Sequence, residues 1–148
     1  MARSVEIRTA SPIDAPFLIT LVGELGYSAS SEEMRMRLEV ACLDPHYAVF
    51  VAESDVIVGW IQIVRTLTLE SGFCGEIRGL VVAKTHRELG IGKKLVAAAE
   101  KWAASHQCER IRVRTNVTRD DARAFYSKLG YSISKTQCVF DKFLSRTA

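Results

Sequence analysis

This sequence of 148 residues contains no apolar stretch close to the ~20 residues that a helix needs to span a bilayer. Its first residues, Met1 to Glu6, lack the apolar core of a secretory signal peptide. No linker, repeat or low-complexity segment divides the sequence. We therefore expect one domain, residues 1–148, that is cytoplasmic and has no membrane partner.

The sequence also lacks the cysteine and histidine patterns of metal sites and disulfide scaffolds. None of its four cysteines forms a CxxC pair, and its three histidines form no H-x-x-x-H set. This argues against zinc and predicts small buried or half-buried thiols in a reducing compartment. We expect no metal.

Strong charge of one sign is absent as well. Lysine and arginine together number 20 against 17 acidic residues, so the net charge is only +3. The basic residues are spread along the chain and form no stripe, which argues against a nucleic-acid partner. Nearly half of the residues are apolar (48%) and a quarter are charged (25%), the balance of a globular protein with a real core.

The sequence does contain a glycine turn, residues 87–94, between a β-type run at 77–82 and a helix-type run at 95–104. A strand that turns through two glycines into a helix leaves the first N–H groups of the helix unpaired. Together with the helix dipole, these groups form an anion site, usually for phosphate. Gly90 and Gly92 remove Cβ atoms from the turn, and the two lysines that follow add positive charge.

Two familiar phosphate motifs do not fit this turn. The dinucleotide fingerprint needs a third glycine where Leu95 stands. A P-loop needs a serine or threonine after its lysine, where Lys94 stands. A plain glycine turn of an α/β domain remains the alternative to a phosphate site.

Two separated motifs carry a family resemblance. Arg87-x-x-Gly90-x-Gly92 resembles the [QR]-x-x-G-x-[GA] motif of the GNAT superfamily, the acyl-CoA-dependent N-acyltransferases. Downstream, residues 122–131 resemble the A-x-x-F-Y-x-K-x-G-[FY] helix of the same family. The resemblance covers roughly residues 49–140, whereas the N-terminal third matches only in its pattern of elements.

The hydrophobic periodicity predicts an order of elements that is also the GNAT order, βααβββαβαββ. We expect an α/β (α+β) fold with a mixed, mostly antiparallel twisted sheet of about six to seven strands and helices on both faces. Helices are predicted between residues 11 and 26, 30 and 44, 92 and 105, and 120 and 129. Strands are predicted at residues 5–8, 47–52, 56–64, 76–82, 110–115, 131–134 and 137–143.

The resemblance implies acetyl-CoA (coenzyme A) as the cofactor. It implies that the backbone of three strand residues, next to a bulge marked by Gly79, pairs with the pantetheine arm: Leu80, Val81 and Val82. It assigns the diphosphate to the turn, namely Arg87, Glu88, Leu89, Gly90, Ile91, Gly92 and Lys93. Asn116 matches the residue that binds the pantetheine or adenine-side arm, although an ordinary capping asparagine fits it too. The three strand residues also read as buried core.

Acyl transfer to an amine requires a base. An alkyl amine of pKa ~10.4 is neutral in only about one molecule in 10³ at pH 7. Forming the neutral, nucleophilic amine therefore costs a free energy of roughly 4–5 kcal/mol. By resemblance, Glu76 is the candidate base, since it begins the strand that leads to the turn. A surface strand-end glutamate is the alternative. A nucleophilic role of Cys74, two residues away, is a weaker one.

Tyr126 matches the family tyrosine that serves the departing thiolate. A full proton transfer from an ordinary tyrosine to a thiolate is uphill by ~2 kcal/mol, so we expect a hydrogen bond to the sulfur instead. The alternative is a core aromatic residue beside Phe125.

The amine acceptor is not identified by the sequence, which offers no dense acidic cluster. By resemblance, the acceptor is bound by the loop at residues 26–31, by residues 67–73 and by residues 134–138, where Tyr27 and Phe73 are candidates for lining an apolar pocket. We expect an N-acetyltransferase, acting by direct transfer in a ternary complex, on a small primary amine rather than a protein lysine. A non-catalytic acyl-CoA-binding or regulatory module and an acyl-CoA hydrolase are the alternatives, and a homodimer is an expectation by analogy only.

Overall fold

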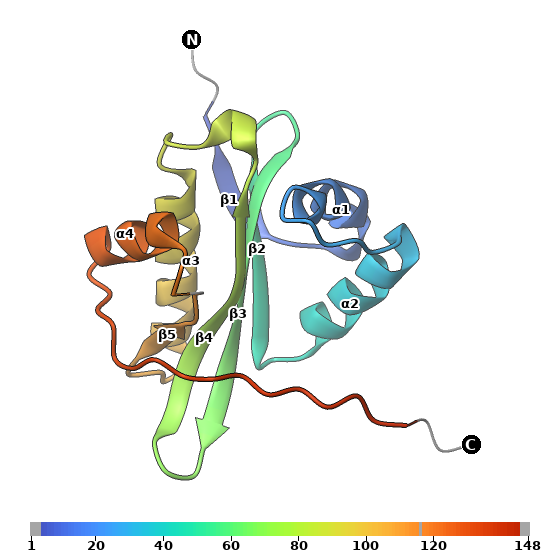
Figure 1. Ribbon diagram of the computed structural model, residues 1–148. Helices are drawn as coiled ribbons and strands as arrows, with labels where there is room; N and C mark the ends of the chain where they lie inside the picture. The colour runs from blue at the N-terminus through green and yellow to red at the C-terminus, as the bar shows by residue number, and fades with distance from the viewer. Residues whose placement is uncertain (1–3, 116, 146–148) are drawn as a thin grey trace. The chain divides into compact units, whose positions relative to one another are not determined.

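The computed structural model describes residues 4–115 and 117–145 of the protein. The chain divides into two compact units, one that ends at Arg114 and one that begins at Thr115 (Figure 1). The elements of the first unit are β1 (Glu6–Thr9), η1 (Pro12–Asp14), α1 (Ala15–Gly23), α2 (Ser31–Leu43), β2 (Tyr47–Glu53), β3 (Ile57–Thr68), β4 (Gly72–Val82), η2 (Lys84–His86), α3 (Ile91–Ser105) and β5 (Ile111–Val113). The second unit contains α4 (Asp120–Lys128).

The described strands form one five-stranded sheet in the order β1-β2-β3-β4-β5. All neighbours are antiparallel except β4 and β5, which are parallel. The fold is therefore a mixed α/β fold, as predicted. Among the described residues, no helix has the length and apolar character that crossing a membrane requires.

Helices cover both faces of the sheet in the first unit (Figure 1). On one face, Leu18 of α1 and Leu38 of α2 share a buried cluster with Val51 of β2. On the other face, α3 packs so closely that a Cβ at Gly59 would lie 3.2 Å from Cδ1 of Leu95. The predicted helices and the first five strands are thus confirmed, because their apolar spacing corresponds to real buried faces.

β3 and β4 form a longer hairpin than the sequence predicts. Their ladder continues out to the pair Thr68 and Gly72, where the positive φ of Gly72 (79°) turns the chain. Residues 67–73, which we expected to be an acceptor loop, are instead the outer end of this hairpin. Hydrophobic periodicity missed these pairs because the hairpin extends beyond the helices into solvent, where Leu67 is 58% exposed.

A bulge interrupts β4 in its middle. Gln62 of β3 pairs with Gly79, and the next residue, Ile63, pairs with Ile77, so that Arg78 is the extra residue. β5 pairs with β4 only over Gly75 to Ile77. Beyond the bulge, residues 79–82 therefore pair with β3 on one side and have no described strand on the other. We call this stretch the open edge of β4.

The second unit ends its helix with a glycine cap. Gly130 adopts φ +94°, and the N–H groups of Gly130 and Tyr131 donate to the carbonyls of Ser127 and Tyr126, at 3.1 and 3.0 Å. These two hydrogen bonds form a Schellman cap.

The two closing strands that we predicted are not present in the structure. Residues 131–145 are described, and they form no ladder with another described segment. The described sheet thus has five strands rather than six to seven. Alternating side chains predict which faces a strand presents, but they do not supply the neighbouring strand whose hydrogen bonds define it.

Candidate active site

The predicted anion site lies at the start of α3. Gly90 is the N-cap of this helix and adopts a left-handed conformation, with φ 80° and ψ 9°. A Cβ placed there would meet nothing within 4 Å, so the backbone conformation, and not a lack of space, is the structural reason for glycine. Gly92 has no such role, since it lies within the first turn of the helix.

The turn presents main-chain donors at the surface. The N–H of Lys94 donates to the carbonyl of Gly90 at 3.1 Å, which is the first bond of the helix. The N–H groups of Ile91, Gly92 and Lys93 precede it and therefore have no helical acceptor. The helix dipole adds positive potential at this end, so the turn is chemically suited to a diphosphate.

Side chains hold this turn in position. Ile91 is only 2% exposed and fixes the first turn of α3 in the core. Nε of Arg87 donates to the carbonyl of Val82 at 3.3 Å, which ties the turn back to the end of β4. Glu88 adopts a positive φ of 64°, and Leu89 is 65% exposed. Lys93 is exposed too, so charge and apolar surface both border the donors.

The open edge of β4 leads directly to this turn. It contains Leu80, Val81 and Val82, the residues to which the resemblance assigns the pantetheine arm. The side chain of Val81 is 3% exposed and belongs to the core cluster, while Leu80 and Val82 are half-buried. Core side chains and an accessible backbone edge thus coexist in one strand, because side chains and ladder bonds point in perpendicular directions.

Gly79 has a contact that the sequence did not reveal. An added Cβ would lie 2.7 and 2.8 Å from ring atoms of Trp60. The bulge expected at Gly79 is present, and a tryptophan ring packs closely against this glycine. Gly79 is therefore fixed by packing as well as by the bulge.

Glu76 is buried, with 8% of the residue exposed, so the alternative of a surface glutamate is wrong. Its Oε1 accepts from Nη1 of Arg114 at 2.5 Å and lies 3.1 Å from Nε of Arg78. Because Glu76 pairs with Val64, two residues after Gln62, it lies on the α1–α2 face of the sheet. The two guanidinium groups hold the carboxylate, and neither arginine was anticipated as its partner.

Tyr126 is the buried residue of α4, in the second unit, with 8% exposed. Its ring makes edge contacts with Phe125 and Tyr131, at centroid distances of 5.0 and 5.5 Å. Burial raises the pKa of Tyr126 to about 12, although the charge of Arg119 acts in the opposite direction. The phenol is thus a proton-bearing donor at neutral pH. Asn116, the other candidate in this region of the sequence, lies outside the described residues.

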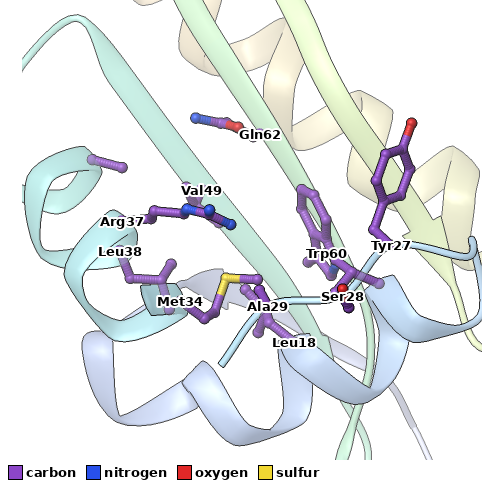
Figure 2. A pocket seen from close by; sticks show the side chains of 12 residues that line it. Leu18, Tyr27, Ser28, Ala29, Met34, Arg37, Leu38, Val49, Trp60 and Gln62 are labelled. Atoms are coloured by element: carbon purple, nitrogen blue, oxygen red, sulfur yellow. The ribbon is translucent and has the colours of Figure 1, made fainter. Parts of the chain in front are cut away.

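A cavity of about 380 Å³ opens on the α1–α2 face of the first unit (Figure 2). It lies among α1, the loop that follows it, α2, β2 and β3. Its lining is mostly apolar and consists of Leu18, Val22, Tyr27, Ser28, Ala29, Met34, Arg37, Leu38, Ala41, Val49, Trp60 and Gln62. Tyr27, a predicted acceptor residue, is in this lining. Phe73, the other one, is not, and its ring instead lies under the guanidinium of Arg65 at 3.6 Å.

Three polar or aromatic members of this lining were not predicted: Arg37, Trp60 and Gln62. A signal existed for two of them, since Trp60 and Gln62 stand two residues apart in a run otherwise rich in isoleucine and valine. Such spacing puts both side chains on one face of a strand. No sequence feature indicated Arg37 as a lining residue, because an arginine on a helix is ordinarily solvated. In the part of the chain that the structure describes, no cluster of His, Cys, Asp or Glu side chains could hold a metal ion.

Comparison with known sequences shows where this chain belongs. A profile of the Acetyltransferase (GNAT) family matches residues 16–131. An aminoalkylphosphonate N-acetyltransferase of Salmonella typhimurium is 33% identical over 137 residues, which cover 87% of this chain and 86% of that protein. An N-alpha-acetyltransferase of Arabidopsis thaliana is 28% identical over 132 residues, 76% of this chain and 69% of the other.

Solved structures share the fold at lower identity. The aminoglycoside N-acetyltransferase AAC(6')-Iy, in complex with CoA, superposes with a TM-score of 0.87 at 18% identity and covers 96% of this chain and 97% of its own. Glucosamine-6-phosphate N-acetyltransferase from Arabidopsis thaliana gives a TM-score of 0.81 at 23% identity, with coverage of 96% and 99%. Sequence profile, relatives and fold agree: the chain belongs to the GNAT family and is an acyltransferase.

Proposed function

We propose that this protein transfers an acetyl group from acetyl-CoA to the primary amine of a small molecule, by direct transfer in a ternary complex. One observation carries this proposal. The open edge of β4 runs into a helix whose N-terminal amides are uncovered by a left-handed glycine. An unpaired strand edge suits the amide-bearing pantetheine arm, and the helix terminus suits the diphosphate.

Glu76 is the proposed base of this reaction. It lies on the α1–α2 face of the sheet, like the cavity. Both of its arginine contacts are to Oε1, so Oε2 is the oxygen proposed to receive the proton. The side chains of Arg78 and Arg114 are each 51% exposed, so both can turn to water at small cost. When Glu76 later releases the proton to solvent, the guanidinium groups pair with the carboxylate again.

Tyr126 is the proposed donor to the leaving thiolate. With its pKa at about 12 against ~8.5 for a thiol, complete proton transfer would be uphill by about 5 kcal/mol. The phenol therefore donates a hydrogen bond to the developing thiolate and keeps its proton, and the thiolate takes its proton from solvent. Burial strengthens such a bond because it removes competing water.

The cavity is the proposed acceptor site. Its volume of about 380 Å³ falls in the range of small-molecule pockets. The names of the relatives indicate different acceptors: one is an aminoalkylphosphonate N-acetyltransferase, another an N-alpha-acetyltransferase, and a structural neighbour is an aminoglycoside N-acetyltransferase. Short connections around the cavity favour a small molecule over an extended peptide.

A thiol-release assay with acetyl-CoA and a panel of amines, amino acids and peptides tests this function. We expect thiol release only when an amine is present. Release without any amine would instead identify an acyl-CoA hydrolase. Coenzyme binding without release for any acceptor would identify a non-catalytic binding module.

Variants assign the roles in the same assay. We expect Glu76→Gln to lower turnover about 10- to 100-fold while coenzyme affinity stays nearly constant. Glu53→Gln is the matched control, because Glu53 is also a strand glutamate paired with an arginine, at 2.9 Å from Arg8, outside the proposed site. Equal turnover in the two variants would remove Glu76 from the mechanism.

A further inference from the structure

The charge that lines the proposed acceptor cavity is positive. Of the twelve residues that line it, Arg37 alone is charged, and none is acidic. An acceptor with several ammonium groups would find no carboxylate in this lining. Glu76 would serve only the amine that reacts, so the other ammonium groups would leave water at a cost. The lining therefore disfavours polyamines and aminoglycosides, and it offers a cation to an acceptor that also bears negative charge.

From this lining we infer that the acceptor carries an oxyanion (carboxylate, phosphonate or phosphate) in addition to its amine, and that Arg37 binds this oxyanion. The inference rests on the proposed function and names the substrate class for the same site. A planar guanidinium matches oxyanions with two parallel hydrogen bonds, which makes arginine the fitting residue for the task.

Arg37 is held in place by the helix but is not committed to another strong partner. The N-cap Ser30 accepts from the N–H of Glu33 at 3.1 Å and fixes where α2 begins. Met34, Leu38 and Ala41 of this helix also line the cavity, and Figure 2 shows Arg37 on the same side of it. Its pair with Glu33 is 3.4 Å long, and the two side chains are 63% and 58% exposed. Exposed pairs of this spacing are weak, so an incoming oxyanion can replace Glu33.

The opposite wall of the cavity connects to the proposed transfer site. Trp60 lines the cavity, and its ring packs against Gly79 at the open edge of β4. Its buried Nε1 is one of two buried side-chain nitrogens without a hydrogen-bond partner in the described part of the chain. A buried donor without an acceptor is unfavourable, which favours a polar ligand or water at this wall. An acceptor whose oxyanion binds Arg37 on the helix side of the cavity places its amine on the strand side.

Matched amines test this inference. We would measure kcat/KM for 3-aminopropylphosphonate, β-alanine, the neutral 3-aminopropanol and the diamine putrescine. We expect both anionic amines to be preferred over the neutral one, and putrescine to be the poorest. The comparison of phosphonate with carboxylate identifies which oxyanion fits better.

Two variants of the same helix separate recognition from general effects. Arg37→Gln should reduce the preference for anionic over neutral amines about 10- to 100-fold, the value of charge-assisted hydrogen bonds. Arg35→Gln is the control, because Arg35 forms an equivalent pair with Glu39 at 3.3 Å, is also 63% exposed, and does not line the cavity. Propylphosphonate, which has no amine, should compete with the acceptor in the wild type and in Arg35→Gln but not in Arg37→Gln.

The outcomes are distinct. Turnover of all amines without preference for an oxyanion, or an equal change in the two arginine variants, would overturn this inference and leave the proposed function intact. Absence of thiol release with every amine would reject the proposed function, and the inference with it.

Discussion

The coenzyme end and the acceptor end of the proposed site are built from different parts of the chain. The coenzyme end uses main-chain groups, at the open edge of β4 and at the N-terminus of α3. The acceptor end uses side chains from several elements, such as Tyr27, Arg37 and Trp60. Main-chain groups are the same in every sequence, whereas side chains change with each substitution. One fold can therefore keep its coenzyme while its acceptor varies.

Gly79 marks the boundary between these two ends. It belongs to the open edge of β4, and the ring of Trp60 from the acceptor cavity covers it. The following variants test whether the two ends are as separable as their construction suggests.

Tyr126→Phe should slow the chemical step and leave the binding of both coenzyme and acceptor unchanged. We expect kcat to fall about 10²- to 10³-fold for every acceptor, the usual cost of a lost transition-state donor. Because burial raises the pKa of Tyr126 to about 12, the phenol stays protonated, and the fall should be the same at pH 7 and pH 9.5. Tyr131→Phe, which keeps the neighbouring ring, is the control. A fall limited to one acceptor would assign Tyr126 to recognition instead.

Gly90→Asp should damage the coenzyme end alone. A carboxylate beside the diphosphate repels it, and we expect coenzyme A to bind about 100-fold more weakly by calorimetry. Gly90→Asn is the matched control, since asparagine tolerates the left-handed conformation and has a similar shape without the charge. The ratio of rates between two amines should not change in either variant. Similar affinities in the Asp and Asn variants would exclude an anion at this turn.

Gly79→Ala should test the boundary. Its methyl group would displace the Trp60 ring, from which the ideal Cβ position is only 2.7 Å away. We expect the KM of the acceptor to rise about tenfold, in line with the cost of overpacking, while coenzyme affinity changes less than about threefold. Gly23→Ala adds a methyl group where nothing lies within 4 Å and serves as the control. A larger effect on the coenzyme than on the acceptor would show that the two ends are not separable.

Asp14→Asn should change neither end, only stability. Asp14 is buried and accepts two hydrogen bonds from Arg8, both 2.9 Å long, which hold the pKa of its carboxyl below the ordinary value. We expect the free energy of unfolding at pH 7 to fall by about 1–3 kcal/mol.

The contribution of Asp14 to stability should decrease as the pH falls. A depressed folded-state pKa stabilises the protein above the unfolded value of ~3.9, and this contribution is lost as pH falls through the folded pKa. The difference between wild type and Asp14→Asn should therefore shrink below about pH 4 in urea titrations. A difference that stays constant down to pH 2 would contradict a role of the charge.

The sequence predicted most of the first unit and the coenzyme end, for a physical reason. Gly90 and the strand before it are local features, and the conformation that they adopt depends on neighbouring residues only. Of the acceptor cavity, Tyr27 was predicted, whereas Arg37 and Trp60 were not, because they come together only when α1 and α2 pack on β2 and β3. The arginine partners of Glu76 were missed for the same reason, since Arg114 reaches it from β5's end through a parallel pairing. The predicted closing strands failed because a strand depends on a distant partner.

Calorimetric comparison of two ligands tests the central claim, that the amides at the start of α3 bind a diphosphate. Coenzyme A and pantetheine share the arm proposed for the open edge of β4, but pantetheine has no diphosphate. We predict that coenzyme A binds at least about 100-fold more tightly than pantetheine and that high salt narrows the difference. Equal affinities, or no heat from millimolar coenzyme A, would contradict the account.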